Sequence, residues 1–235
     1  MKIVGYLKTS LIEWPGKISS VIFVPGCNFA CPFCHNANLV DPKKIKKLTI
    51  ISEKEILADL KKREKWIDGV VITGGEPTLQ SDLTDFLQKI KKLGFLTMIQ
   101  TNGSQPEVIR NLLIRKLVDY LTLDLKGDFK NYQKFTGVKN YTPEVKKSLK
   151  IISDSGIDFE LRTTVVPTIH NEKVLLKMAK DLKSIIENCR WYLQTFQPKN
   201  CLSPKFNKIK PYSKMEMEGF VKAVSKIVPG TKLRD

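Results

Sequence analysis

Short runs of β-branched and other apolar residues alternate with helix-forming segments along the chain, and this alternation limits the fold more than any other feature. Six segments have the pattern of a strand, at about 19–24, 70–72, 95–100, 119–125, 158–166 and 191–196. Helical patterns alternate with them, at about 52–66, 81–93, 106–116, 143–153, 172–186 and 213–227. This repeated β–α order predicts a parallel sheet, because right-handed crossovers place each helix on a face of the sheet.

The number of β–α units favours an incomplete α/β barrel. A complete barrel of this type has eight units, and this chain shows about six. A flat, doubly wound sheet would have the same alternation, so both architectures stay open at this point. The length of 235 residues suits a single domain, which we expect to span 1–235, with a lead-in at 1–18 and a core at about 19–228.

The composition excludes several classes of protein. A hydrophobic fraction of 42% is enough for a core, and the longest apolar stretches are far shorter than the ~18–20 residues of a membrane helix. The N-terminus lacks the long apolar run and the small-residue cleavage site of a signal peptide. We therefore expect a cytoplasmic protein without a membrane partner.

The chain is strongly basic, with 40 Lys and Arg residues against 24 Asp and Glu residues and a formal charge of +16. A solvated, lysine-rich surface explains such an excess, and the run Lys43, Lys44, Lys46 and Lys47 fits this explanation. An acidic protein partner or a phosphate-bearing substrate would explain it too, and Lys43 and Lys44 would suit an acidic docking surface. Nucleic acid is a less favoured partner.

Unusual residues gather where four successive strands end. The segment Cys27–Cys34 follows the first strand, Gly74–Pro77 the second and Thr101–Gly103 the third, while Asp124–Lys126 ends the fourth. In both barrels and open α/β sheets, ligands bind at the carboxyl ends of the strands, which meet at one edge. The sequence therefore predicts a ligand site at this edge.

Three of the five cysteines, Cys27, Cys31 and Cys34, have the spacing C-x3-C-x2-C. Clustered thiols in an intracellular protein bind metal or carry out redox chemistry more often than they form disulfides. One candidate is a zinc site with His35 as the fourth ligand, although adjacent residues such as Cys34 and His35 usually point apart. The other is a [4Fe–4S] cluster on three cysteines, which leaves one iron open to a further ligand.

This cysteine spacing, with the aromatic Phe33 before the last cysteine, resembles the signature of the radical S-adenosylmethionine (radical SAM) enzymes. The resemblance covers nearly the whole chain and implies a partial (β/α)6 TIM-like barrel. It implies that Cys27, Cys31 and Cys34 hold a [4Fe–4S] cluster, whose open iron binds the amino and carboxylate groups of S-adenosylmethionine. It also implies that Phe33 lies near the adenine.

The resemblance further implies a set of cofactor-binding residues. The Gly-Gly-Glu-Pro segment is similar to the family's GGEP motif, whose bare glycine backbone admits the ligand and whose carboxylate binds the methionine amino group. A turn with a surface glutamate is the plainer explanation. The implied cofactor-binding residues are Phe33, His35, Gly74, Gly75, Glu76, Asn102, Asp124, Lys126 and Arg162.

Three of these residues have an alternative role on their strands. Asp124 and Lys126 alternate with leucines, so both charges face inward, where they serve a ligand or pair with each other. Their Asp-Leu-Lys segment resembles one that contacts S-adenosylmethionine in activases of glycyl-radical enzymes. Arg162 could reach the cofactor carboxylate or pair with Glu160 on the same face of its strand.

Three further positions have no assigned cofactor role. Gln100 stands where the activases commonly have an acidic residue that helps to hold a monovalent cation, which leaves that cation site open. Gln197 stands in the stretch where some activases have a histidine near the cofactor. His170 lies in a predicted loop and has no inferred role.

Within the family, the segments Ser10–Lys17 and Cys31–Asn36 most resemble activating proteins of anaerobic ribonucleoside-triphosphate reductase. The resemblance implies an enzyme that reductively cleaves S-adenosylmethionine into methionine and a 5′-deoxyadenosyl radical. That radical would take a hydrogen atom from a glycine of the reductase or of another glycyl-radical protein. An electron donor such as flavodoxin or ferredoxin would be the second partner, and no catalytic side chain is expected beyond the cluster and cofactor.

Two other functions remain open at this point. One is a radical SAM enzyme that acts on a small molecule or a tRNA base, as in deazapurine synthesis or tRNA modification, and the +16 charge modestly favours it. The other is a non-enzymatic zinc-binding module.

Overall fold

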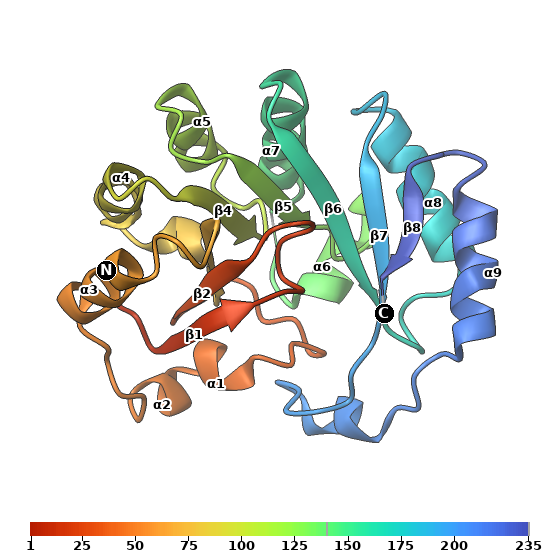
Figure 1. Ribbon diagram of the computed structural model, residues 1–235. Coiled ribbons are helices and arrows are strands. Elements are labelled where there is room, and N and C mark those ends of the chain that lie inside the picture. Colours follow the sequence, from red (N-terminus) through yellow and green to blue (C-terminus); the bar gives the residue numbers. More distant parts are fainter. Residues whose placement is uncertain (140, 235) are drawn as a thin grey trace.

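The computed structural model describes residues 1–139 and 141–234, and in this part of the chain it shows an open α/β barrel (Figure 1). One sheet contains eight strands in the order of the sequence, so each strand pairs with the next along the chain. The first pair is antiparallel and all later pairs are parallel. The strands are β1 (Gly5–Ser10), β2 (Ser19–Val24), β3 (Gly69–Gly74), β4 (Leu96–Thr101), β5 (Tyr120–Asp124), β6 (Asp158–Val165), β7 (Arg190–Thr195) and β8 (Thr231–Arg234).

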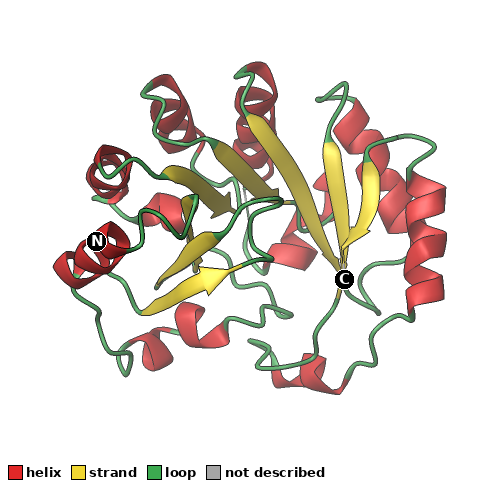
Figure 2. Ribbon diagram, viewed as in Figure 1, coloured by secondary structure: helices red, strands yellow, loops and turns green. Residues whose placement is uncertain are grey.

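The longer helices cover the outer side of the curved sheet (Figure 2). These are α3 (Glu53–Lys62), α4 (Leu83–Lys92), α5 (Pro106–Ile114), α7 (Thr142–Asp154), α8 (Glu172–Lys183) and α9 (Lys214–Val224). Shorter helical segments are α1 (Ala37–Val40), α2 (Pro42–Ile45), α6 (Tyr132–Thr136), η1 (Pro77–Leu79), η2 (Phe129–Asn131) and η3 (Pro204–Lys208). Sequential strand order with the helices on one side confirms the incomplete barrel, because a doubly wound sheet reverses its strand order and has helices on both faces.

The sheet extends beyond the strands that the sequence predicts. β1 lies within the segment expected to be only a lead-in, and β8 follows the strand at 191–196 that we expected to be the last. Both predictions are wrong for a physical reason. β1 is an edge strand whose middle residues are exposed, and β8 has only four residues, so neither has the buried alternation that marks a strand.

Successive side chains of each strand point to opposite faces of the sheet, and the two faces pack into separate cores. Outward-facing residues such as Ile22, Ile72 and Leu121 are buried against the helices. A smaller inner cluster contains Trp14, Val21, Val71, Met98 and Tyr120. The Trp14 and Tyr120 ring centroids lie 5.9 Å apart, at the first residue of β5. Trp14 therefore fills the amino-terminal end of the barrel, and the open space lies at the carboxyl ends of the strands.

None of the helices in the described ranges is long and apolar enough to cross a membrane.

Candidate active site

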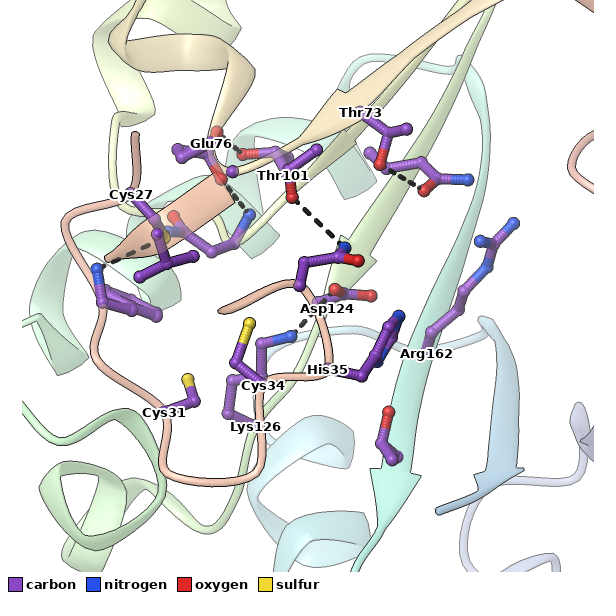
Figure 3. A pocket seen from close by; sticks show the side chains of 18 of the residues that line it. Cys27, Cys31, Cys34, His35, Thr73, Glu76, Thr101, Asp124, Lys126 and Arg162 are labelled. Atoms are coloured by element: carbon purple, nitrogen blue, oxygen red, sulfur yellow. Dashed lines mark hydrogen bonds and ion pairs between the residues drawn. The ribbon is translucent and has the colours of Figure 1, made fainter. Parts of the chain in front are cut away.

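A pocket opens at the carboxyl ends of the strands, and residues from all four predicted strand-end groups line it (Figure 3). All twelve predicted site residues are part of its lining: Cys27, Cys31, Phe33, Cys34, His35, Gly74, Gly75, Glu76, Asn102, Asp124, Lys126 and Arg162. Cys189 and Cys201 are not, which agrees with their place outside the cysteine motif. The structure thus brings together residues that are up to 135 positions apart in the sequence (27 to 162).

The cysteine loop follows β2 and has three free thiols at the pocket. Two N–H groups point at the first of them, since the Asn102 side-chain amide lies 3.6 Å and the Phe29 backbone nitrogen 3.4 Å from the Cys27 sulfur. N–H donors stabilise a thiolate, which is the form that binds iron. The loop itself is held by a backbone hydrogen bond from Cys34 to Cys31.

The three thiols need a metal to lose their protons. Burial raises the pKa of Cys27 to about 11 and that of Cys31 to about 12, and it also raises the pKa of Cys34. Metal binding to such thiols releases protons. In the described ranges, no group of three His, Cys, Asp or Glu side chains has the geometry to hold a single metal ion. Three thiols around one pocket, with amide donors directed at sulfur, suit the larger [4Fe–4S] cluster.

Glu76 is a buried carboxylate, with 1% of its surface exposed. Its Oε1 accepts hydrogen bonds from the Thr78 N–H at 3.0 Å, the Thr78 hydroxyl at 2.5 Å and the Thr101 hydroxyl at 2.7 Å. Its Oε2 accepts one from the Asn102 N–H at 2.6 Å. Burial raises the pKa of Glu76, and these hydrogen bonds act in the opposite direction. The alternative of a surface glutamate is wrong, while its contact with the cofactor ammonium stays a prediction.

The two glycines before Glu76 meet the backbone of the cysteine-bearing segment. A Cβ on Gly75 would lie 1.9 Å from the carbonyl oxygen of Gly26, and one on Gly74 would lie 2.5 Å from that of Val24. Gly74 also has a φ of +117°, which side chains rarely permit. The glycines are therefore required for the loops after β2 and β3 to pack together, in addition to any approach of a ligand.

The predicted pairing of Asp124 with Lys126 is confirmed, and their contact with the cofactor stays a prediction. They line the pocket, and the Lys126 ammonium lies 2.8 Å from the Asp124 carboxylate. Burial on its own would lower the pKa of Lys126, but the negative charge of Asp124 outweighs it and raises that pKa. Lys126 is therefore a cation beside the cysteine loop.

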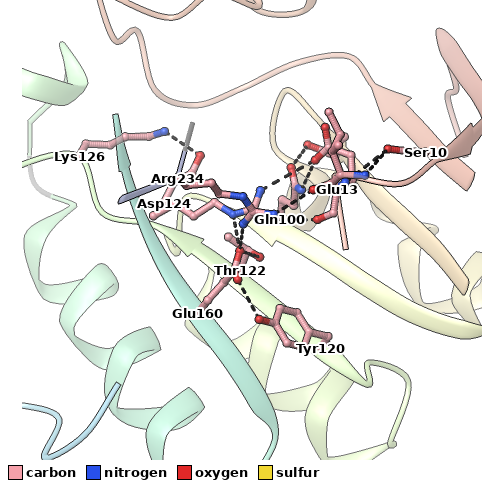
Figure 4. A network of polar contacts seen from close by, with 12 residues as sticks. Ser10, Glu13, Gln100, Tyr120, Thr122, Asp124, Lys126, Glu160 and Arg234 are labelled. Carbon is pink, nitrogen blue, oxygen red and sulfur yellow. Dashed lines mark hydrogen bonds and ion pairs between the residues drawn. The ribbon is translucent and has the colours of Figure 1, made fainter. Parts of the chain in front are cut away.

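Charged and polar side chains form a network that shares Arg162 with the pocket lining (Figure 4). The buried Glu160 carboxylate accepts hydrogen bonds from Tyr120, Arg162 and Arg234, at 2.9, 2.5 and 2.5 Å. The predicted alternative of an Arg162–Glu160 ion pair is thus confirmed. Arg162 also donates to the carbonyl oxygen of Glu13 at 3.1 Å and lines the pocket. Its contact with the cofactor carboxylate stays a prediction.

Gln100 is held at both ends of its side-chain amide. Its oxygen accepts a hydrogen bond from the Thr73 hydroxyl at 2.8 Å, and its nitrogen donates to the Glu13 carboxylate at 2.9 Å. A neutral amide with two protein partners therefore occupies the place where the activases commonly have an acidic residue.

His170 is a structural residue behind the pocket, although the sequence assigned it no role. It is 1% exposed, and its ring stacks on Phe135 and meets the ring of Phe33 edge-on. Its Nδ1 accepts a hydrogen bond from the Val166 N–H, so its Nε2 donates to the Lys126 carbonyl oxygen. It therefore holds the backbone of one predicted site residue and the ring of another.

The sequence missed several residues of the pocket. These are Glu13, Phe29, Asn36, Val40, Thr73, Thr164 and Gln194. Strand alternation could have identified two of them, because Thr164 shares a face with Arg162 and lies in register with Gln194 of the next strand. Gln197, which stands in the stretch where some activases have a histidine near the cofactor, is exposed and is not part of the lining.

Comparison with known proteins agrees with this site. The family model of the radical SAM superfamily matches residues 21–182. A Methanocaldococcus jannaschii protein named "Putative glycyl-radical enzyme activating enzyme" is 35% identical over 98% of this chain and 94% of its own length. The pyruvate formate-lyase-activating enzyme of Clostridium pasteurianum is 31% identical over 77% of this chain and 74% of its own. The 7-carboxy-7-deazaguanine synthase of Clostridium acetobutylicum is 29% identical over 67% and 70%.

Solved structures support the fold. The structure of Streptococcus suis SuiB bound to S-adenosylmethionine superimposes with a TM-score of 0.66 at 18% identity, over 92% of this chain and 52% of that one.

The family match and the first relative settle the class of protein. They exclude a non-enzymatic zinc-binding module, because the matched family consists of enzymes that use a [4Fe–4S] cluster and S-adenosylmethionine. The three thiols, the charged strand ends and the open barrel fit these two cofactors. The chain therefore belongs to the radical SAM superfamily.

Proposed function

We propose that this protein is an activating enzyme that generates a glycyl radical on a partner protein, and that the partner is an anaerobic ribonucleoside-triphosphate reductase. The observation that carries the proposal is the similarity, over nearly the whole chain, to a protein named "Putative glycyl-radical enzyme activating enzyme". The two activating enzymes match more of this chain, at higher identity, than the deazaguanine synthase does. The choice of reductase rests on the segments Ser10–Lys17 and Cys31–Asn36.

The side chains of the pocket have distinct tasks in this proposal. Cys27, Cys31 and Cys34 hold the cluster, and the amides directed at Cys27 stabilise its thiolate. When bound, the cluster and S-adenosylmethionine supply the 5′-deoxyadenosyl radical that abstracts hydrogen. We assign cofactor binding to the polar strand ends and the adenine side to Phe33, which is buried beside the cysteines.

The open barrel supports a macromolecular substrate. β1 and β8 are the two edges of the sheet in the described ranges, so the strands do not close into a ring. A loop of a partner protein that carries the target glycine could enter through such an opening. The cysteines line the pocket at the carboxyl ends of the strands, so an entering loop would meet the cluster there.

The test is the dependence of cofactor cleavage on the partner. Reduced, cluster-loaded protein should cleave S-adenosylmethionine slowly when alone, and the anaerobic reductase should accelerate formation of 5′-deoxyadenosine. A variant reductase in which the target glycine is replaced by alanine is the matched control, and it should not give a stable radical. If the reductase leaves the cleavage rate unchanged, the proposal fails.

A radical SAM enzyme acting on a nucleobase precursor or a tRNA is the second candidate. The similarity to a deazaguanine synthase and the net charge of +16 favour it. Stimulation of cleavage by a nucleobase precursor, or salt-sensitive binding of tRNA, would select this candidate, because contacts to phosphates give a steep dependence of affinity on salt.

A further inference from the structure

Three lysine-rich segments surround the cysteine loop on the outside of the pocket. The first segment is 37–48 and contains α1 and α2. The second is 126–139 and contains η2 and α6. The third is 197–214 and contains η3. Eleven exposed lysines of these segments, which we call the lysine rim, are Lys43, Lys44, Lys46, Lys47, Lys130, Lys134, Lys139, Lys199, Lys205, Lys208 and Lys210.

Each segment is fixed to the cysteine loop. In the segment 197–214, the Leu202 N–H donates to the Cys34 carbonyl oxygen and the Ser203 N–H to that of Pro32, both at 2.9 Å. From α6, the Thr136 carbonyl oxygen accepts a hydrogen bond from the Ala30 N–H at 2.8 Å. The segment 37–48 continues directly from the loop. The lysine rim therefore keeps a fixed position relative to the three cysteines.

The rim has a large excess of positive charge, although Lys210 interacts electrostatically with the exposed carboxylate of Glu216. The only acidic residues in the three segments, Asp41 and Asp128, have structural partners, since Asp41 caps α2 and Asp128 pairs with Lys177. Within the described ranges, none of the rim lysines forms an ion pair with a carboxylate. An uncompensated field of one sign attracts a partner of the opposite sign and speeds its encounter.

The residues of the rim favour an acidic protein over a nucleic acid. The three segments contain no arginine, which is the side chain best suited to bidentate contacts with phosphate. The aromatic residues of the segment 197–214 are also engaged in the fold. Phe206 packs against Phe33, and Tyr212 packs against Phe220 and donates a hydrogen bond to the His170 carbonyl oxygen. They are therefore not free to stack on bases.

The rim lies outside the pocket, so a protein bound there does not occupy the substrate's place. None of the residues 197–214 lines the pocket, and neither do the rim lysines of the other two segments. The segment 197–214 is hydrogen-bonded to the backbone carbonyl groups of Cys34 and Pro32. A protein docked on this segment would therefore still lie close to Cys34. Electron transfer requires a carrier that docks close to the cluster, because the rate of transfer falls steeply with distance. The carrier also has to leave the substrate pocket free.

We infer that the lysine rim is the docking surface for an acidic protein that carries one electron to the cluster. In each transfer, the reduced carrier loses one electron and the cluster gains it, and no bond is formed or broken. The inference deepens the proposed function by naming its second partner. It depends on the cluster site but not on the identity of the glycyl-radical protein.

The experiment compares two charge-reversal variants with the same change in net charge. The rim variant is Lys205→Glu/Lys208→Glu/Lys210→Glu. The control variant is Lys61→Glu/Lys62→Glu/Lys65→Glu, whose exposed lysines lie at the carboxyl end of α3, near the start of β3 and away from the cysteine loop. Both variants are loaded with the cluster, and iron content and circular dichroism confirm that they are intact. The probe is an acidic flavodoxin in its hydroquinone form, whose oxidation by one electron is followed by flavin absorbance in an anaerobic stopped-flow instrument.

The rim variant should oxidise flavodoxin about tenfold more slowly than the control variant at low salt, because steering by opposite charges changes association rates by tenfold or more. The wild-type rate should fall as salt rises, and the rim variant should lose most of this salt dependence. Both variants should be reduced equally fast by dithionite, which is small and needs no docking surface.

Equal flavodoxin rates for the rim and control variants would overturn the inference. So would a rim variant that loses binding of tRNA while its flavodoxin rate is unchanged. If the rim variant loads less cluster, Lys205→Gln/Lys208→Gln/Lys210→Gln replaces it, with a smaller effect of the same sign. Dithionite-reduced rim variant should still form a glycyl radical on the reductase, so failure of the docking surface is distinguishable from failure of the proposed function.

Discussion

The Glu76 carboxylate accepts a hydrogen bond from the backbone N–H of Asn102 at 2.6 Å, and this bond ties the loop after β3 to the loop after β4. Asn102 in turn directs its side-chain amide at the Cys27 sulfur. One buried carboxylate thus links the predicted cofactor-binding loop, the third strand end and the cluster ligands.

Replacing Glu76 with Gln should weaken S-adenosylmethionine binding by roughly tenfold to a hundredfold, or about 1.4–2.8 kcal/mol. The amide keeps the shape of the carboxylate but removes its charge, and its NH2 group faces at least one of the four N–H and O–H donors. Calorimetric titration of cluster-loaded protein measures the affinity. Glu64→Gln, at an exposed position, is the control and should bind normally. Normal affinity in the Glu76 variant would show that this carboxylate has no influence on the cofactor.

The single variants Cys27→Ala, Cys31→Ala and Cys34→Ala should each lose most of the about four irons that a [4Fe–4S] cluster contains. Each removes one of three thiolate ligands at the pocket. Cys189→Ala is the control, because Cys189 lies outside the pocket lining and should leave iron content unchanged. Iron and sulfide analysis after anaerobic reconstitution decides the matter, and stoichiometric zinc without iron–sulfur absorption would contradict this assignment.

Trp14→Ala should destabilise the protein by about 3–5 kcal/mol, because the indole fills the amino-terminal end of the barrel and no neighbour can replace its volume. Trp66→Ala makes the same chemical change at a side chain that is 74% exposed, so it should cost less than about 0.5 kcal/mol. Urea unfolding of the two variants provides the comparison. Similar losses in both would show that Trp14 does not support the barrel.

Acid should destabilise the protein through His170. Burial lowers the pKa of His170 to about 4, against 6.5 in the unfolded chain, so the unfolded state binds more protons between these values. Stability is therefore full above pH 6.5 and is lost as the pH falls toward 4, by about 2 kcal/mol between pH 7 and pH 5.

The variant His170→Phe should lose this part of the pH dependence, although it will be less stable at pH 7 because it lacks two hydrogen bonds. Urea unfolding at pH 7 and pH 5 measures the difference. Burial lowers the pKa of His35 as well, so His35→Gln should lose the contribution of His35 to the drop and keep that of His170. An unchanged drop in His170→Phe would mean that other groups cause the acid sensitivity.

The predictable parts of the fold are those in which local pattern and tertiary packing agree. Ser19–Val24 is buried along nearly its whole length, and the structure gives the strand the predicted bounds. β1 and β8 lie at the edges of the sheet, where polar residues face solvent, so their sequences have no strong strand pattern. Their pairing depends on partners that the local sequence does not reveal.

The site residues at the ends of the predicted strands could be predicted from the sequence. The residues that reach the site from distant segments could not. The alternation on β5 was enough to place Asp124 and Lys126 inside the barrel. Glu13 reaches the pocket from the loop after β1 and meets Gln100, 87 residues further on. Arg234 reaches Glu160 from the edge strand β8. Contacts over such separations follow from barrel curvature and not from local pattern.

We propose that this enzyme places a radical on a glycine of a partner protein. The most direct test is electron paramagnetic resonance of the anaerobic reductase after incubation with reduced, cluster-loaded enzyme and S-adenosylmethionine. We expect a doublet from a glycyl radical on the reductase, and we expect it to be absent when Cys31→Ala enzyme is used. A reductase that stays free of radical, while a nucleobase precursor or a tRNA stimulates cofactor cleavage, would contradict it.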